Sequence, residues 1–161
     1  MHFIAEWSAN QGRNLIYIRP SVIEVFQHHI QSGPSDLEGG GILLGYVRGS
    51  HLEIIEATEP TRFDRRFRMF FERMHNLHEQ IAHKQWTESE GLIRYIGEWH
   101  THPQDYPSPS GTDLIEWQKL ALKRKDKHPV LGLIVGRKTL YLESMPSSGE
   151  GTKFYPIDEY R

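Results

Sequence analysis

The chain has 161 residues, enough for one hydrophobic core, and we expect residues 1–161 to form a single domain. Its 19 Lys and Arg residues nearly balance its 21 Asp and Glu residues, which argues against a general electrostatic grip on nucleic acid. The absence of cysteine excludes disulfides, thiolate nucleophiles and cysteine-ligated metal sites. Any metal site must therefore use His, Asp or Glu side chains.

No stretch of the sequence has the pattern of a targeting or membrane segment. The first residues lack a basic flank followed by a long apolar run, and nowhere do about eighteen apolar residues occur together. We therefore expect a cytoplasmic protein with no membrane partner. No motif demands an oligomer, so the sequence leaves the oligomeric state open and a monomer is compatible with it.

The first third of the chain predicts a strand, a helix and a pair of strands. Residues 14–20 (NLIYIRP) alternate as a strand does, and residues 21–31 have a helical period. Residues 39–49 (GGGILLGYVRG) form a continuous apolar run bounded by glycines, which suits a buried central strand with residues 51–60 as its neighbour. The apolar face of the helix consists of Val22, Val25, Phe26 and Ile30.

Residues 62–71 (RFDRRFRMFF) alternate apolar and charged side chains, which predicts one strand. The arginines of this strand could face an acidic or phosphorylated partner, although a solvated face of an edge strand is the simpler interpretation. These arginines are Arg62, Arg65, Arg66 and Arg68.

From Glu72 the period becomes helical, and the predicted helix ends near residue 91. The segment HEQIAH nearly reproduces the H-E-x-x-H pattern of zinc proteases. Its second histidine comes one residue too late, however, and points roughly 140° away from the first. We therefore predict that the histidines here lie on the helix surface. The apolar stripe is formed by Met74, Leu77, Ile81 and Trp86, and the histidines are His75, His78 and His83.

The second half of the chain predicts a strand at residues 92–102, a helix at residues 110–124, and a strand pair at residues 130–136 and 140–145. The helix begins with an S-x-x-D capping pattern at Ser110. With no repeats and no long linker, the order of elements indicates a mixed α/β (α+β) fold with helices covering a largely buried sheet.

Two histidines one residue apart on a strand suggest a metal site. His100 and His102 project from the same strand face, roughly 7 Å apart along the strand, and Pro103 ends the strand. Asp113 follows in the first turn of the next helix, so a His-His-Asp set could bind zinc and leave a fourth position for water. The alternative is a chance H-x-H pair followed by an ordinary helix cap.

The segment HTHPQDYPSPSGTD, residues 100–113, resembles the H-[ST]-H-x7-S-x-x-D signature of the JAB/MPN (JAMM) metallopeptidases, with no departure in spacing. That family also has a glutamate just before a glycine-rich apolar strand. The segment LEGGGILLGY supplies it as Glu38, in the pattern E-x-G-G-x-L-L-G. The resemblance rests on two separated motifs and extends over nearly the whole chain, which implies a JAB/MPN-type central mixed β-sheet flanked by helices.

This resemblance implies a zinc peptidase or isopeptidase with one catalytic Zn²⁺. By carry-over, His100, His102 and Asp113 would bind the metal, and Glu38 would be the general base. Ser110 would hydrogen-bond the oxyanion or the attacking water.

Glu98 is the alternative general base, because it lies on the same strand face as the two histidines. Many family members have an aromatic residue here, whereas the GEW of this chain is similar to bacterial stand-alone members. We favour Glu38 as the base and expect Glu98 to act behind the metal ligands, where it would orient an imidazole.

The short length and the GEWHTHP motif look most like bacterial stand-alone JAB proteins, in particular the deconjugating peptidases of CBASS antiphage operons. Those enzymes remove a CD-NTase from the proteins to which its C-terminus is conjugated. The implied substrate is a protein conjugate whose extended C-terminal tail lies in a groove, by strand addition. Two alternatives stay open, namely trimming of a sulfur-carrier protein or small adduct, and a catalytically inactive MPN scaffold.

Overall fold

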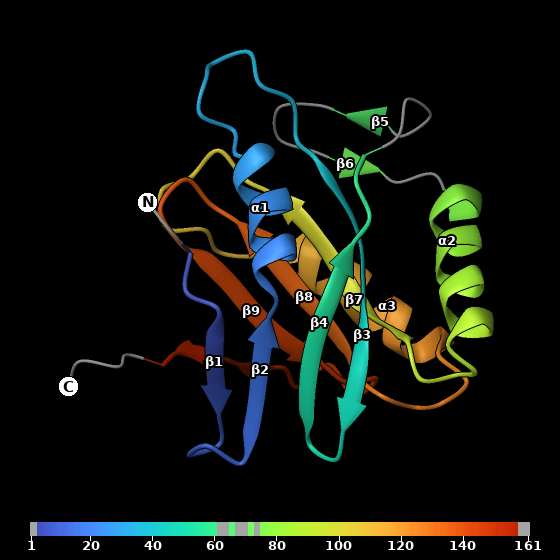
Figure 1. Cartoon of the computed structure of the whole chain (residues 1–161). Helices are drawn as coiled ribbons and strands as arrows, with labels where there is room; N and C mark the ends of the chain where they lie inside the picture. Colours follow the sequence, from blue (N-terminus) through green and yellow to red (C-terminus); the bar gives the residue numbers. More distant parts are fainter. Residues whose placement is uncertain (1–2, 61–64, 67–70, 73–74, 158–161) are drawn as a thin grey trace.

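The computed structural model describes residues 3–60, 65–66, 71–72 and 75–157 (Figure 1). Its helices are α1 (Pro20–His28), α2 (His75–Glu88) and α3 (Gly111–Lys123). Its strands are β1 (Glu6–Ala9), β2 (Asn14–Ile18), β3 (Gly40–Arg48), β4 (His51–Ala57), β5 (Arg65–Arg66), β6 (Phe71–Glu72), β7 (Arg94–Thr101), β8 (Val130–Val135), β9 (Leu140–Met145), β10 (Thr152–Lys153) and β11 (Tyr155–Pro156).

Nine of these strands form one mixed sheet in the order β10-β9-β8-β7-β3-β4-β2-β1-β11. The pairs β7–β8 and β2–β4 are parallel, and the other neighbours are antiparallel. The predicted α+β architecture, a mixed sheet flanked by helices, is therefore confirmed. The prediction that residues 39–49 form a buried central strand is also confirmed, because β3 occupies the middle of the sheet and its first six residues are buried.

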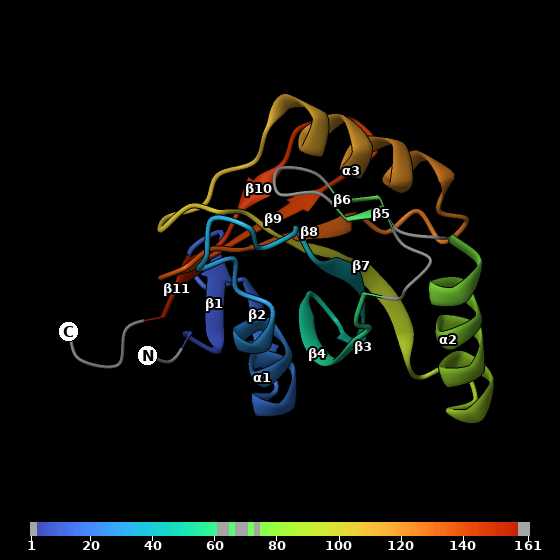
Figure 2. The ribbon, with the colours of Figure 1, turned by 90° about the horizontal axis from the view of Figure 1, so that it is seen from above.

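Helices cover both faces of the sheet. Figure 2 shows α1 on one side and α3 on the other, with α2 beside β3 and β7. The strand β8 is buried at all six positions, as expected for a strand with side chains packed on both faces. On the α1 side, Phe26 packs against Trp99 of β7 with ring centroids 5.2 Å apart. On the α3 side, Trp117 packs with Ile134 and Met145.

Gly132 in β8 determines how closely α3 can approach the sheet. A Cβ atom at this position would lie 2.2 Å from the indole ring of Trp117, so only glycine leaves room for that ring. Trp117 follows Asp113 by one helical turn, and its packing against Ile134 of β8 holds the start of α3 against the sheet.

We expect Gly132→Ala to destabilise the protein, because the added methyl group must displace Trp117. Overpacking of this kind typically costs about 1–3 kcal/mol of unfolding free energy. Urea unfolding of the metal-free protein measures this change. The matched control is Gly111→Ala, since a Cβ atom there meets nothing within 4 Å and is expected to have a much smaller effect.

The structure corrects the prediction of a continuous strand over residues 62–71. The described parts of this region are β5 and β6, two short strands that pair antiparallel with each other in a sheet separate from the main one. Alternation along the sequence does not reveal a reversal of the chain, which explains the error. The side chains of the four arginines predicted here lie outside the described residues.

The structure also corrects the prediction that all the histidines of α2 lie on its surface. His78 is fully buried, and its Nδ1 atom lies 2.7 Å from the Thr58 hydroxyl oxygen. Thr58 also accepts a hydrogen bond from the backbone N–H of Ile42, so this contact ties α2 to β3. In contrast, the predicted stripe residues Ile81 and Trp86 are exposed.

The last described residues close the fold across both sheet edges. The strand β10 pairs with β9 at one edge, and β11, which follows after only Phe154, pairs with β1 at the other. Phe154 is buried between them, and its backbone N–H donates to Leu142. None of the helices in the described ranges combines the length and apolar character needed to cross a membrane.

Candidate metal centre

Strand pairing and the start of a helix bring the predicted site residues to one end of the sheet. His100 lies near the end of β7 and pairs with Gly40, the first residue of β3. Glu38 lies two residues before β3 and is therefore placed beside the two histidines, although 62 positions separate it from His100 in the sequence. The loop after β7 returns to α3, whose N-cap is Ser110.

The donor atoms of three predicted ligands form a small triangle. The Nε2 atoms of His100 and His102 are 3.1 Å apart. One carboxylate oxygen of Asp113 lies 3.3 Å from Nε2 of His100, and the other lies 3.3 Å from Nε2 of His102. Donor atoms of Glu38, His100 and His102 also lie within 4.8 Å of one another, which makes this set a candidate metal site.

These separations fit a small tetrahedral cation. With zinc–ligand bonds of about 2.0–2.1 Å, tetrahedral donors must lie roughly 3.3–3.4 Å apart, because the edge is about 1.6 times the bond length. The observed separations of 3.1–3.3 Å come close to that edge, with a different carboxylate oxygen of Asp113 facing each imidazole. Two imidazole nitrogens and one carboxylate are also the donor types that zinc prefers, so the chemistry and the geometry agree.

The predicted cap at the start of α3 is confirmed and holds Asp113. The Ser110 hydroxyl oxygen accepts a hydrogen bond from the backbone N–H of Asp113 at 3.1 Å, while the backbone N–H of Ser110 donates to the Asp113 carboxylate at 2.9 Å. This capping box fixes the carboxylate that faces the two imidazoles. The Ser110 hydroxyl retains its own proton for donation.

The titratable side chains of the site shift the pKa values of one another. Burial raises the pKa of Glu38 to about 8, although His102 opposes this shift. Burial would raise the pKa of Asp113, but hydrogen bonds from His100 and His102 outweigh it and hold that pKa well below its usual range. Burial would lower the pKa of His102, but hydrogen bonds to Asp113 and Gln104 outweigh it and raise that pKa. A bound cation would favour the carboxylate form of Glu38.

Gln104, which the sequence did not single out, fixes the tautomer of His102. Its side-chain oxygen accepts a hydrogen bond from the backbone N–H of Ser108 at 3.3 Å, and lies 3.0 Å from Nδ1 of His102. The Ser108 N–H donor identifies this atom as the amide oxygen of Gln104, and because an amide oxygen can only accept, Nδ1 of His102 donates to it. The Nε2 atom of neutral His102 then presents a lone pair toward the triangle, as a metal ligand must.

We expect Gln104→Leu to weaken zinc binding by about 10- to 100-fold, the usual effect of removing a hydrogen-bond partner of a ligating histidine. Competition with a chromophoric chelator measures this affinity. Gln118→Leu is the matched control, because the side chain of Gln118 donates to the backbone oxygen of Ser147 instead of a ligating histidine. Unchanged zinc affinity in Gln104→Leu would refute this role.

The group of mutually close donor atoms formed by Glu38, His100 and His102 includes neither Glu98 nor Asp113. Asp113 nevertheless contacts both imidazoles. The carboxylate of Glu98 accepts a short hydrogen bond from the Tyr95 hydroxyl, three residues earlier in the same strand. The register of β7 against β8 is continuous here, so Glu98 does share a strand face with His100.

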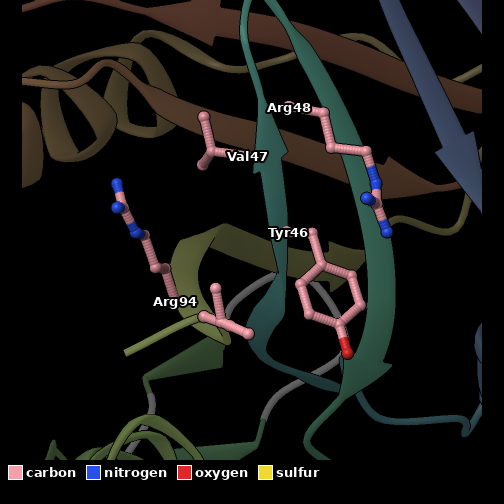
Figure 3. Close-up of a pocket in the computed structure, with 5 residues that line it drawn as sticks. Tyr46, Val47, Arg48 and Arg94 are labelled. Carbon is pink, nitrogen blue, oxygen red and sulfur yellow. The ribbon is translucent and has the colours of Figure 1, made fainter. Parts of the chain in front are cut away.

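A separate pocket of about 340 Å³ lies at the other end of β3 and β7 (Figure 3). Tyr46, Val47 and Arg48 line it from the end of β3, and Arg94 lines it from the start of β7. The Arg48 guanidinium lies over the Tyr46 ring and pairs with Glu53. Since His100 and Glu38 lie at the opposite ends of these strands, this pocket is not part of the candidate metal centre.

Comparison with known proteins gives the family. Residues 21–147 match the family described as prokaryotic homologs of the JAB domain, which covers most of the chain and both motifs. The chain belongs to the prokaryotic JAB family. A solved structure similar to this JAB chain is a solution structure from Desulfitobacterium hafniense, with a TM-score of 0.58, 19% identity, and coverage of 89% of this chain and 91% of the other. At that identity the likeness concerns the fold alone.

Curated relatives of this JAB chain carry the name CD-NTase/cGAS isopeptidase. One from Pseudomonas aeruginosa is 51% identical over 158 residues, which cover 98% of this chain and 100% of the relative. One from Escherichia coli is 36% identical over 129 residues, which cover 80% of this chain and 81% of the relative. The family resemblance inferred from the two motifs is therefore confirmed.

Proposed function

We propose that this JAB chain is a zinc-dependent isopeptidase that releases a CD-NTase from the proteins to which its C-terminus is conjugated. The observation that carries this proposal is the triangle of Nε2 and carboxylate donors, since it turns the family motif into a metal-binding geometry. The full-length similarity to a CD-NTase/cGAS isopeptidase supports the substrate class.

His100, His102 and Asp113 would hold one zinc ion. A bound zinc ion supplies Lewis acidity, which polarises a carbonyl oxygen and lowers the pKa of a water to about 7. Catalytic zinc sites typically have three protein ligands and leave the fourth position for water or substrate, which matches this set of three. The capping box at Ser110 holds the Asp113 carboxylate in place for this task.

Glu38 would act as the general base and then as the general acid. Its carboxylate takes a proton from the attacking water and passes it to the leaving lysine amine, so the C–N bond breaks to a carboxylate and an amine. Its burial and its position beside His100 and His102 support this role. The Ser110 hydroxyl would donate to the oxyanion that develops on the carbonyl oxygen.

The substrate would be a protein conjugate rather than a free small molecule. A CD-NTase would present an extended C-terminal tail, which can add to the fold as a strand and reach the centre with its terminal amide. The retention of all three ligand residues and of Glu38 argues against an inactive scaffold. The cysteine-free composition is compatible with our proposed cytoplasmic location.

A substrate trap tests this function. Zinc-loaded Glu38→Ala protein is mixed with lysate of the native host, and the captured proteins are identified by mass spectrometry. We expect branched CD-NTase conjugates, which the wild-type enzyme then splits at the isopeptide bond. The matched control is Glu98→Ala, which should release its substrate. Capture of small carrier proteins alone would contradict the proposal and favour the trimming activity.

A further inference from the structure

Glu38 sits at the end of a loop, and a general base needs a fixed position. The loop from His29 to Gly39 connects α1 to β3, and Glu38 is its last residue but one. Hydrogen bonds within the loop stabilise its first half, because the carboxylate of Asp36 accepts from the backbone N–H groups of Ser32 and Gly33. A displacement of this loop would move the Glu38 carboxylate away from the donor triangle.

Thr101, the middle residue of the H-T-H motif, holds the residue that follows Glu38. The backbone N–H of Gly39 donates to the Thr101 hydroxyl oxygen at 2.9 Å, and the backbone N–H of Thr101 donates to the carbonyl of Gly39 at 2.9 Å. Thr101 is fully buried and lies on the strand face opposite to the two histidines. One residue of β7 therefore binds both polar groups of the Gly39 backbone.

Gln31 completes a directed chain of hydrogen bonds. The Thr101 hydroxyl donates to the side-chain oxygen of Gln31 at 2.7 Å, and the side-chain nitrogen of Gln31 donates to the carbonyl of Asp36 at 3.1 Å. Gln31 is 1% exposed, so these bonds are made away from water. Because the Thr101 hydroxyl gives its only proton to Gln31, its oxygen is left to accept from Gly39.

We propose that Gln31 and Thr101 are positioning residues that hold the Glu38 loop against the strand carrying His100 and His102. This inference rests on the proposed function, since it assigns Glu38 as the base. The chain of hydrogen bonds runs from Asp36 through Gln31 and Thr101 to Gly39. It therefore holds the backbone of the loop on both sides of Glu38. Neither side chain is a metal ligand, and neither needs to touch the substrate.

The test uses Thr101→Val, which keeps the shape of the side chain but removes its hydroxyl, and Thr101→Ser, which keeps the hydroxyl. In Thr101→Val we expect amide hydrogen exchange of Gly39 to rise about tenfold, with or without zinc, because one buried hydrogen bond is lost. We expect kcat to fall by about 10- to 100-fold with KM and bound zinc unchanged. Thr101→Ser should restore both values.

Gln31→Leu gives the second test, with Gln118→Leu as the matched control. We expect Gln31→Leu to lower kcat in the wild-type background but to cause no further loss in the Glu38→Gln background, because both changes act through the same carboxylate. Equal losses in both backgrounds, loss of zinc, or an unchanged kcat would overturn the inference.

Failure of the inference can be told apart from failure of the proposed function. If wild type cleaves the conjugate and Glu38→Gln does not, an unaffected Thr101→Val refutes the positioning role alone. If wild type is inactive although Gly39 exchange rises in Thr101→Val, the hydrogen-bond chain is supported and the proposed function is refuted.

Discussion

Glu38→Gln is expected to lower kcat for isopeptide cleavage by about 10²- to 10⁴-fold, the usual contribution of a general base. The amide keeps the size of the side chain but cannot take a proton from water. Bound zinc should stay at one ion per chain, since His100, His102 and Asp113 are intact. Steady-state cleavage of a purified conjugate, with metal content measured on the same sample, tests this expectation.

Glu98→Gln is the matched control for that experiment. Its carboxylate accepts a hydrogen bond from Tyr95 and is not among the mutually close donors of the candidate site. We therefore expect kcat of Glu98→Gln to stay within about tenfold of wild type, because the introduced amide oxygen can still accept the hydrogen bond from Tyr95 and the proposed base and ligands are intact. A full loss in Glu98→Gln with an active Glu38→Gln would reverse the two assignments.

The second large effect is expected at Asp113. In Asp113→Ala we predict loss of stoichiometric zinc and a loss of activity at least as large as in Glu38→Gln, because one of the three proposed ligands is lost. Chelation of the wild-type protein should have the same effect on activity, and added zinc should restore the wild type but not the variant. Metal analysis and activity before and after zinc addition measure both results.

The capping role of Asp113 can be separated from its role as a ligand. Asp113→Asn retains an acceptor for the backbone N–H of Ser110, whereas Asp113→Ala does not. In metal-free protein we therefore expect Asp113→Ala to lose about 1 kcal/mol more unfolding free energy than Asp113→Asn. If Asp113→Ala still binds stoichiometric zinc, the Asp113 carboxylate of the wild type serves only as a helix cap, and the ligand assignment is contradicted.

Local rules explain why the sequence predicted much of the candidate site. Alternation along a strand places His100 and His102 on one face, and the S-x-x-D pattern makes Ser110 and Asp113 a capping box in any helix that starts there. The place of Glu38 is different. It depends on the register of β3 against β7, a long-range property that only the family resemblance supplied.

His78 illustrates a buried position that the sequence pattern did not reveal. The predicted stripe residues Ile81 and Trp86 are exposed, so the helical period did not identify the buried face of α2. Polar character suggested a surface position, but the Thr58 hydroxyl offers a buried partner. The burial of His78 therefore depends on a partner 20 residues away in the sequence, which the pattern of α2 does not contain.

Gln31 and Gln104 also had no signal in the sequence. Gln31 meets Thr101 across 70 residues of sequence, and a lone glutamine after a helix has no spacing rule that predicts such a contact. Gln104 acts within a loop, through contacts with His102 and Ser108 that depend on how the backbone turns. The short strands β10 and β11 were missed for a similar reason, since two residues are too few to show a period.

The most direct test of the central claim is mass spectrometry of the products formed from a defined conjugate. The substrate is a CD-NTase joined through its C-terminal carboxyl group to a lysine of a second protein, and the enzyme is the zinc-loaded wild-type chain. We predict two products only, a CD-NTase ending in its native carboxylate and a target with a free lysine amine, and none after chelation. An intact conjugate, cleavage elsewhere in the chain, or equal cleavage without metal would contradict the account.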